Sequence, residues 1–183
     1  MELSRDLYHA QQTLVALFSV TNKLQMLGDK HLRYLTLRQT LAIPALVHAP
    51  GGRATINHLA RSMGTSKQSA KQIVDALARK GYLSVAPSGQ DRRAVNVSVT
   101  AAGRQTFGVC SERTDEFLAA LFTNFTSGEL EALSTLLQKL FRFDGAARDA
   151  SNGPPVYDES ASEEIVRHHR RFTELRAGAK EPE

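Results

Sequence analysis

The chain has 183 residues, 42% of them hydrophobic, and a single cysteine. Its 23 lysines and arginines outnumber its 19 acidic residues, which leaves a net charge of +4 at pH 7. This length suits one domain, or one domain with an appendage, and a lone cysteine excludes an internal disulfide. No apolar run is long enough to cross a bilayer and the first residues do not form a signal peptide, so we expect a cytoplasmic protein.

The beginning of the chain predicts a long amphipathic helix over residues 4–27. Ser4 can cap this helix, and leucines and a phenylalanine recur along it at helical spacing. Gly28 and Asp29 are expected to end it.

A second helix is expected from Thr36. Thr36 and Gln39 form a T-x-x-Q capping box, in which each side chain bonds the backbone N–H of the other residue. Pro44 falls inside this helix and predicts a kink, because proline lacks the N–H that a helix needs. Residues 48–53 hold a proline and two glycines and are expected to form a loop.

From residue 54 to residue 143, apolar stripes alternate with capping and turn residues. They predict, in order, a very short strand (54–56), a helix (56–63), a helix ending near residue 80, a hairpin (82–86 and 95–99), a long helix (101–122) and a helix after Thr126 with a leucine stripe. The expected caps and turns are Thr55, Gly64, Thr65 or Ser66, Gly81, Thr100 and the Thr126–Glu129 capping box.

The composition changes beyond residue 144. Residues 145–160 are rich in small and polar residues and are interpreted as a linker. Residues 161–183 are interpreted as a helical tail that is too poor in apolar residues to be stable alone. If ordered, the tail is expected to pack through Ile165, Phe172 and Leu175, which would leave Arg167, Arg170 and Arg171 outward.

Residues 59–66 have the pattern L-A-x-x-x-G-x-S, which is typical of the turn in a helix-turn-helix. The helix that follows has an apolar face made by Ala70, Ile73, Val74 and Leu77. Its opposite face carries residue types that bond base edges: Ser66, Lys67, Gln68, Ser69, Lys71 and Gln72. A merely solvated helix face is the alternative interpretation.

The hairpin after this helix favours DNA binding. Its tip carries Asp91, Arg92 and Arg93, and the segment from Arg61 to Arg93 holds seven basic and two acidic residues. Positive charge gathered in one segment is what phosphate binding requires. The predicted fold is therefore mainly α with a small β-hairpin wing: a winged helix-turn-helix plus long helices.

Over about residues 6–143 the chain resembles the MarR family of bacterial transcription regulators. The similarity rests on Leu35-Thr36, on Lys80-Gly81-Tyr82-Leu83, and on a wing similar to D-x-R…L-T-x-x-G, here Asp91-Arg92-Arg93 followed by Val99-Thr100 and Gly103. Val99 replaces the usual leucine, and Val85 stands near a position where the family often has an arginine.

The resemblance implies a winged-helix domain over residues 1–144 with a DNA-binding lobe at about 36–100, called the winged lobe below. It implies a homodimer built from the first and last long helices, bound to a pseudo-palindromic operator and acting as a repressor. Arg93 would enter the minor groove, and Asp91 would orient it. A small anionic or phenolic effector is implied too, with lining residues expected at Phe18, Tyr34, Arg38 and His48.

Two other functions stay open, a winged helix used as a protein-interaction module and a metal- or redox-responsive regulator. Cys110 has no base or cation beside it in sequence and is interpreted as a buried thiol. The histidines are scattered without metal-ligand spacing, so neither a metal nor another cofactor is expected. The nucleophile-elbow, zincin, P-loop and dinucleotide-binding patterns do not occur, so no enzyme is expected.

Overall fold

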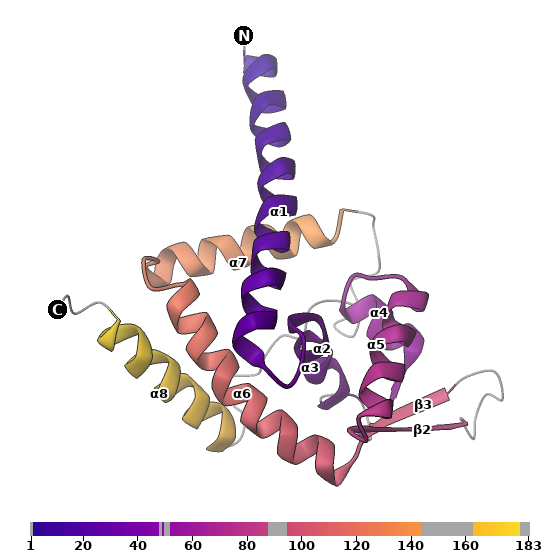
Figure 1. Ribbon diagram of the computed structural model, residues 1–183. Coiled ribbons are helices and arrows are strands. Elements are labelled where there is room, and N and C mark those ends of the chain that lie inside the picture. Colours follow the sequence, from indigo (N-terminus) through magenta and orange to yellow (C-terminus); the bar gives the residue numbers. More distant parts are fainter. Residues whose placement is uncertain (1, 48, 50–51, 88–94, 144–162, 180–183) are drawn as a thin grey trace.

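The computed structural model describes residues 2–47, 49, 52–87, 95–143 and 163–179. Helix α1 (Glu2–Leu32) projects from a body that is crossed by a second long helix, α6 (Ala101–Leu121) (Figure 1). The winged lobe lies on one side of α6, and α8 (Glu163–Gly178) lies along another. In the described part of the chain, none of the helices has the length and hydropathy needed to cross a membrane.

The winged lobe contains short helices and one small sheet. The helices are α2 (Leu37–Leu41), α3 (Ile43–Val47), α4 (Ile56–Ser62) and α5 (Lys67–Arg79). Strands β1 (Ala54–Thr55), β2 (Leu83–Pro87) and β3 (Val95–Val99) form an antiparallel sheet in the order β1-β3-β2. The central position of β3 places Val97 opposite Ala54 on one side and opposite Val85 on the other. The predicted hairpin is confirmed.

A single apolar core joins the winged lobe to α6. Leu46, Leu59, Leu77 and Val97 are each at most 2% exposed. Phe107 and Cys110 of α6 belong to the same cluster of buried residues. Burial of a large aliphatic side chain contributes about 1.5–3 kcal/mol, so this shared core fixes the lobe firmly on the first half of α6.

The cap predicted at Ser4 is wrong, because α1 begins at Glu2 and Ser4 lies inside it, but the other predicted helix caps are confirmed. Thr36 and Gln39 form the capping box, and Thr126 and Glu129 form another at the start of α7 (Ser127–Phe141). Thr55, Ser66 and Thr100 cap α4, α5 and α6. The kink expected at Pro44 occurs as a break, which separates α2 from α3 at Ala42.

The predicted end of the first helix is wrong. Gly28 and Asp29 lie inside α1, which continues to Leu32, and Arg33 then takes a positive φ of 56°. A Cβ on Gly28 would lie 3.0 Å from a methyl carbon of Leu37, and the Asp29 carboxylate accepts the Leu37 N–H at 2.6 Å. These two residues therefore bring α1 against the start of α2.

The tail helix docks along α6, and one detail expected for it is wrong. Arg171 does not point outward, because its guanidinium lies 2.7 Å from the Glu116 carboxylate of α6. Phe172 and Leu175 are half-buried, as expected of a docked face. The predicted linker lies outside the described residues, and so does the side chain of Ile165.

Candidate nucleic-acid interface

The turn before α5 is built from a glycine and a serine cap. Gly64 has a φ of +59°, a conformation that costs glycine little and other residues more. The Ser66 hydroxyl oxygen accepts the Ser69 N–H at 3.1 Å and begins the helix. A Cβ on Gly64 would meet the ring of Phe141, 2.7 Å away, so the end of α7 touches this turn.

Helix α5 separates the predicted residues onto two faces. Ala70, Val74 and Leu77 are at most 1% exposed, and Ile73 is half-buried against the same core. The exposed face carries Ser66, Lys67, Gln68, Lys71 and Gln72. The partly buried Ser69 is the one member of the predicted set that lies between the two faces, where its hydroxyl accepts a hydrogen bond from Ser66 at 3.0 Å.

Lys71 has a partner that the sequence analysis did not single out. Its ammonium lies 2.6 Å from the carboxylate of Asp75, and both side chains are exposed. The i,i+4 spacing was the available signal. Because an exposed ion pair contributes about 1 kcal/mol or less, a phosphate or a base edge can replace Asp75 at small cost.

The strands that lead to the wing tip are in register up to Pro87 and Val95. Asp91, Arg92 and Arg93 lie beyond them, outside the described residues, so their place in the interface stays a prediction. Val85, which stands near the expected family arginine, is exposed on β2.

The base of the wing is held by Thr100 and Gly103. Thr100 donates its N–H to the Tyr82 carbonyl at 3.0 Å and its hydroxyl to the Gly81 carbonyl at 2.7 Å. A Cβ on Gly103 would lie 2.1 Å from that Tyr82 oxygen, so only glycine fits there without a shift of the backbone. The T-x-x-G part of the motif thus joins the end of α5, the hairpin and α6.

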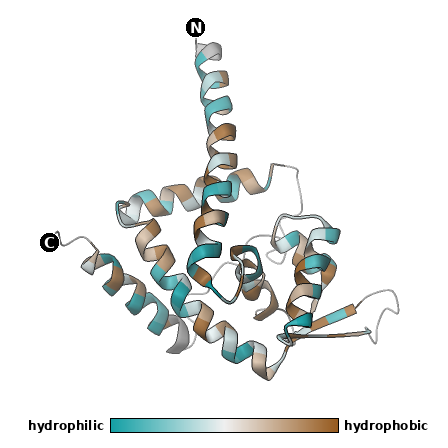
Figure 2. Cartoon of the chain, viewed as in Figure 1, coloured by the Kyte–Doolittle hydropathy of each residue, from teal (hydrophilic) through white to brown (hydrophobic). Residues whose placement is uncertain are grey.

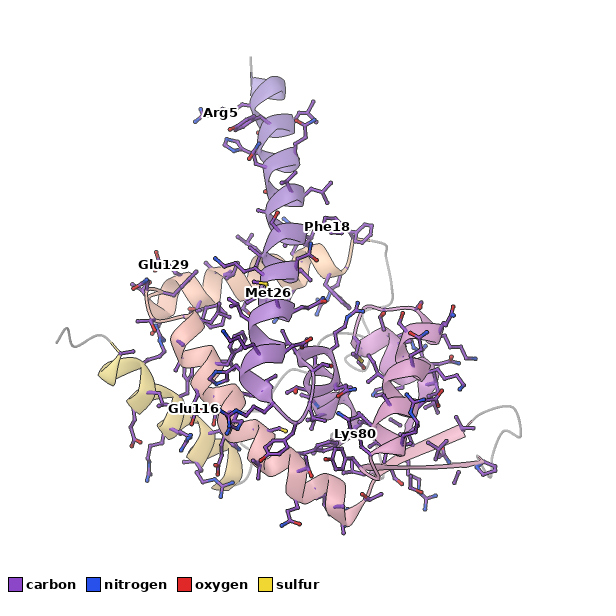
Figure 3. The ribbon with its side chains drawn as sticks, in the orientation of Figure 1. Arg5, Phe18, Met26, Lys80, Glu116 and Glu129 are labelled. Atoms are coloured by element: carbon purple, nitrogen blue, oxygen red, sulfur yellow. The ribbon has the colours of Figure 1, made fainter. Side chains whose placement is uncertain are left out.

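Lys80, one of the basic residues counted between Arg61 and Arg93, makes contacts within the fold. Its ammonium donates to the Tyr34 carbonyl at 3.0 Å and to the Gln39 side chain at 3.3 Å (Figure 3). It therefore holds the end of α5 to the connection between α1 and α2.

The expected effector residues do not converge within one chain. Phe18 is exposed on α1, about four turns or roughly 21 Å of helix before Leu32. Tyr34 and Arg38 are exposed near the start of α2, and His48 lies outside the described residues. Any site that includes Phe18 and Tyr34 together would need a second chain.

Apolar residues occur along both α1 and α7 (Figure 2), and many of their side chains are exposed in the described chain. The following residues are each at least 42% exposed: Leu7, Tyr8, Leu14, Val15, Phe18, Leu136, Leu137 and Leu140. Apolar patches of this kind on a soluble domain are typical of a protein–protein interface.

Cys110 is fully buried, as the sequence analysis expected. Burial raises the pKa of its thiol, against the smaller opposing effects of Arg113 and Lys80. Among the described residues, no group of three or more histidine, cysteine and acidic side chains is placed to hold a metal ion.

One constellation was missed by the sequence analysis. His168 of α8 places Nδ1 2.6 Å from an Asp115 carboxylate oxygen and Nε2 3.2 Å from the Ser111 hydroxyl. Serine, histidine and aspartate in this order are the parts of a hydrolase triad. Here they lie in the seam between α6 and α8, where the two bonds join the helices. The four-residue spacing of Ser111 and Asp115 is a weak signal, and His168 is too distant in sequence to be paired with them by pattern.

Residues 35–94 match the family model described as the MarR family. No curated protein matches the chain. The fold is similar to that of a mutant MarR from E. coli solved with operator DNA, with a TM-score of 0.61 and 23% identity over 68% of this chain and 89% of that one. It is also similar to a probable transcriptional regulator from Pseudomonas aeruginosa, with a TM-score of 0.63 and 22% identity over 69% and 94% of the two chains.

A third similar structure is the organohalide-sensing regulator RdhR in its 2,4-dichlorophenol-bound form, with a TM-score of 0.67 and 18% identity over 81% of this chain and 90% of that one. These likenesses show the shared fold, and the family match covers the turn, α5 and the first strand of the hairpin. The match over residues 35–94 and the shared fold together show that the chain resembles the MarR family of winged helix-turn-helix regulators.

Proposed function

We propose that this protein is a repressor that binds a pseudo-palindromic DNA operator as a homodimer. The observation that carries the proposal is the exposed face of α5, where Lys67, Gln68 and Gln72 stand on a helix that the core holds rigidly behind a tight turn. A rigid helix with long polar side chains near its N-terminus is what the major groove admits. The wing arginines Arg92 and Arg93 would add contacts beside it.

The homodimer is supported by the apolar faces of α1 and α7. A two-fold axis between the lobes would cover these faces and place two copies of α5 on the same side of the molecule. Reading helices in such dimers lie about one DNA turn apart, roughly 34 Å. The DNA site should therefore be two half-sites related by two-fold symmetry.

The test is selection of bound sequences from a random duplex pool, followed by affinity measurements at several salt concentrations. The logarithm of affinity should fall linearly with the logarithm of salt, because bound lysines and arginines displace counterions. Lys67→Ala and Gln68→Ala should each weaken binding by about 1–3 kcal/mol and relax the base preference at one position. Lys139→Ala, an exposed lysine of α7, is the control. A salt-independent affinity, or equal effects of Lys67→Ala and Lys139→Ala, would contradict the proposal.

A small anionic or phenolic effector that releases the DNA is the second part of the proposal. Similar structures include one with 2,4-dichlorophenol bound and the Bordetella bronchiseptica regulator BpsR, whose DNA binding is regulated by 6-hydroxynicotinic acid. Arg38 supplies a cation and Phe18 and Tyr34 supply rings for such a ligand. Salicylate and 2,4-dichlorophenol are suitable probes: Arg38→Gln should weaken release by salicylate and leave release by the neutral phenol unchanged. If both probes release DNA equally from the wild type and the variant, Arg38 is not part of the effector site.

A further inference from the structure

We propose that α8 is a strap that fixes α1 relative to α6 and thereby sets the spacing of the two reading helices in the dimer. Glu116 is the positioning residue through which the strap acts. This inference rests on the proposed function, because a spacing has meaning only for a dimer on DNA.

Several polar contacts hold the strap to α6. His168 has a partner on α6 at each ring nitrogen, the Asp115 carboxylate at 2.6 Å and the Ser111 hydroxyl at 3.2 Å. Asp115 is only 8% exposed, and a carboxylate so deeply buried requires partners. Removal of His168 would leave Asp115 buried with fewer of them, so the pair favours the docked position of α8.

Two arginines extend the seam along α8. Arg171 lies 2.7 Å from the Glu116 carboxylate, and Arg176 donates to the backbone carbonyl of Phe125 just beyond α6. The Arg176 guanidinium also lies over the ring of Phe172 at 5.4 Å. Because these contacts are spread over more than two turns of α8, they fix its direction as well as its position on α6.

Glu116 joins three helices. One of its carboxylate oxygens lies 2.7 Å from Arg171 of α8, and the other lies 3.8 Å from the His31 ring in the last turn of α1 (Figure 3). The His31 ring also packs near the ring of Phe117, with 5.8 Å between centroids. The strap therefore contacts α6 directly and reaches the end of α1 through one carboxylate.

The same end of α1 is tied to the winged lobe. Asp29 accepts the Leu37 N–H at the start of α2, and Gly28 allows α1 to approach Leu37. Contacts thus run from α8 through Glu116 to α1 and on to α2. In the proposed dimer α1 is also a contact helix, so its angle to α6 decides how far apart the two lobes stand.

The experiment measures affinity for synthetic operators whose half-sites are moved one or two base pairs closer or farther apart. Arg171→Glu places two acids against each other and should release the strap. It should reduce the discrimination between the best and the altered spacings about fivefold or more, while the base preference within each half-site is unchanged. Arg170→Glu is the matched control, since Arg170 is its exposed neighbour and the same charge is reversed.

The exchanged pair, Glu116→Arg with Arg171→Glu, should restore the docking of α8 but not the discrimination between spacings, because an arginine at position 116 leaves His31 of α1 without a facing carboxylate. Limited proteolysis of residues 163–179 provides a measure of docking that does not depend on DNA, and Arg171→Glu should be cut faster than Arg170→Glu. If sequence-specific binding occurs and the two single variants respond alike to spacing, the proposed role of α8 is contradicted and the proposed function stands. If the unaltered chain binds no duplex, both are overturned.

Discussion

Gly103 shows how one missing side chain decides the junction of wing and helix. Its α-carbon faces the Tyr82 carbonyl, which already accepts hydrogen bonds from Thr100. Gly103→Ala should destabilise the protein by about 1–3 kcal/mol, because the new methyl group overpacks a site lined by backbone.

Gly108 is the control, since it lies exposed on the same helix with nothing within 4 Å of an added Cβ. Gly108→Ala should stabilise the protein by up to about 1 kcal/mol, the helix-propensity difference between the two residues. Denaturant unfolding of the two variants gives the comparison, and equal shifts in the same direction would show that the close approach at Gly103 is not rigid.

The reactivity of Cys110 distinguishes a redox-responsive regulator from one that does not sense oxidants. Since burial raises the pKa of its thiol, less thiolate is present at any given pH, and the thiolate is the reactive form. The native protein should react slowly with an alkylating reagent, and denaturant should accelerate the reaction strongly. DNA affinity should be the same for Cys110→Ala and wild type after peroxide treatment. Rapid alkylation of the folded protein would favour a sensing thiol.

At the scale of helices and strands, local patterns predicted what local contacts form. The capping boxes at Thr36 and Thr126 each need two residues three positions apart, so the sequence alone locates α2 and α7. The opposite faces of α5 were predictable for the same reason, because helical periodicity separates Val74 and Leu77 from Gln68 and Gln72.

Contacts between distant segments were not predictable from local pattern. In sequence, Gly28 looks like a residue that ends a helix. In the structure it lies inside α1, where the absence of a side chain allows close contact with Leu37 of the next helix. His168 and Asp115 are 53 positions apart, and no periodicity links them. Arg171 was expected to point outward for the same reason, since Glu116 becomes its partner only once α8 is docked on α6.

The leucine stripe of α7 is the element on which dimer formation should depend most. Leu137 is 42% exposed in the single chain, and Leu137→Asp would bury an unpaired charge if that face is the interface. The cost is several kcal/mol, enough to shift the protein to monomer at micromolar concentration. Gln138→Asp, which adds the same charge one position away, should leave the dimer intact. Light scattering over a concentration series distinguishes them, and a dimeric Leu137→Asp would move the interface elsewhere.

The start of α7 should be sensitive to acid. Thr126 donates its backbone N–H and hydroxyl to the Glu129 carboxylate, both at 2.8 Å, and these bonds lower the pKa of Glu129 below its ordinary value of 4.5. A lowered pKa in the folded state means that the ionised group stabilises the protein above about pH 4.5 and loses this effect as the pH falls through the lowered value. Glu129→Gln should therefore lower the melting temperature at pH 7, and this difference should shrink as the pH falls below 4.5 and Glu129 becomes protonated. A difference that persists in acid would show that the charge is not involved.

Considered as a whole, the molecule buries its apolar residues in two different ways. The winged lobe and the first half of α6 share a core that lies within one chain, with buried residues from Leu35 to Cys110. The first half of α1 and the outer face of α7 have no such cover in the described chain. The protein should consequently melt at a temperature that rises with its concentration, as expected when association contributes to stability. A melting temperature that is independent of protein concentration over a hundredfold range would mean that no second chain covers these faces.

The first half of α1, which projects from the body of the molecule, should fold after the winged lobe. Residues 5–16 are exposed along their whole length, and an isolated helix of this size is marginal in water. The backbone amides of this segment should exchange with solvent hydrogen rapidly in the monomer and become protected only as two chains meet. Those of α5 and β3 should be protected at any concentration. The lobe would then be a finished structure before association, and the first four turns of the chain would acquire their helix in the same step that creates the dimer.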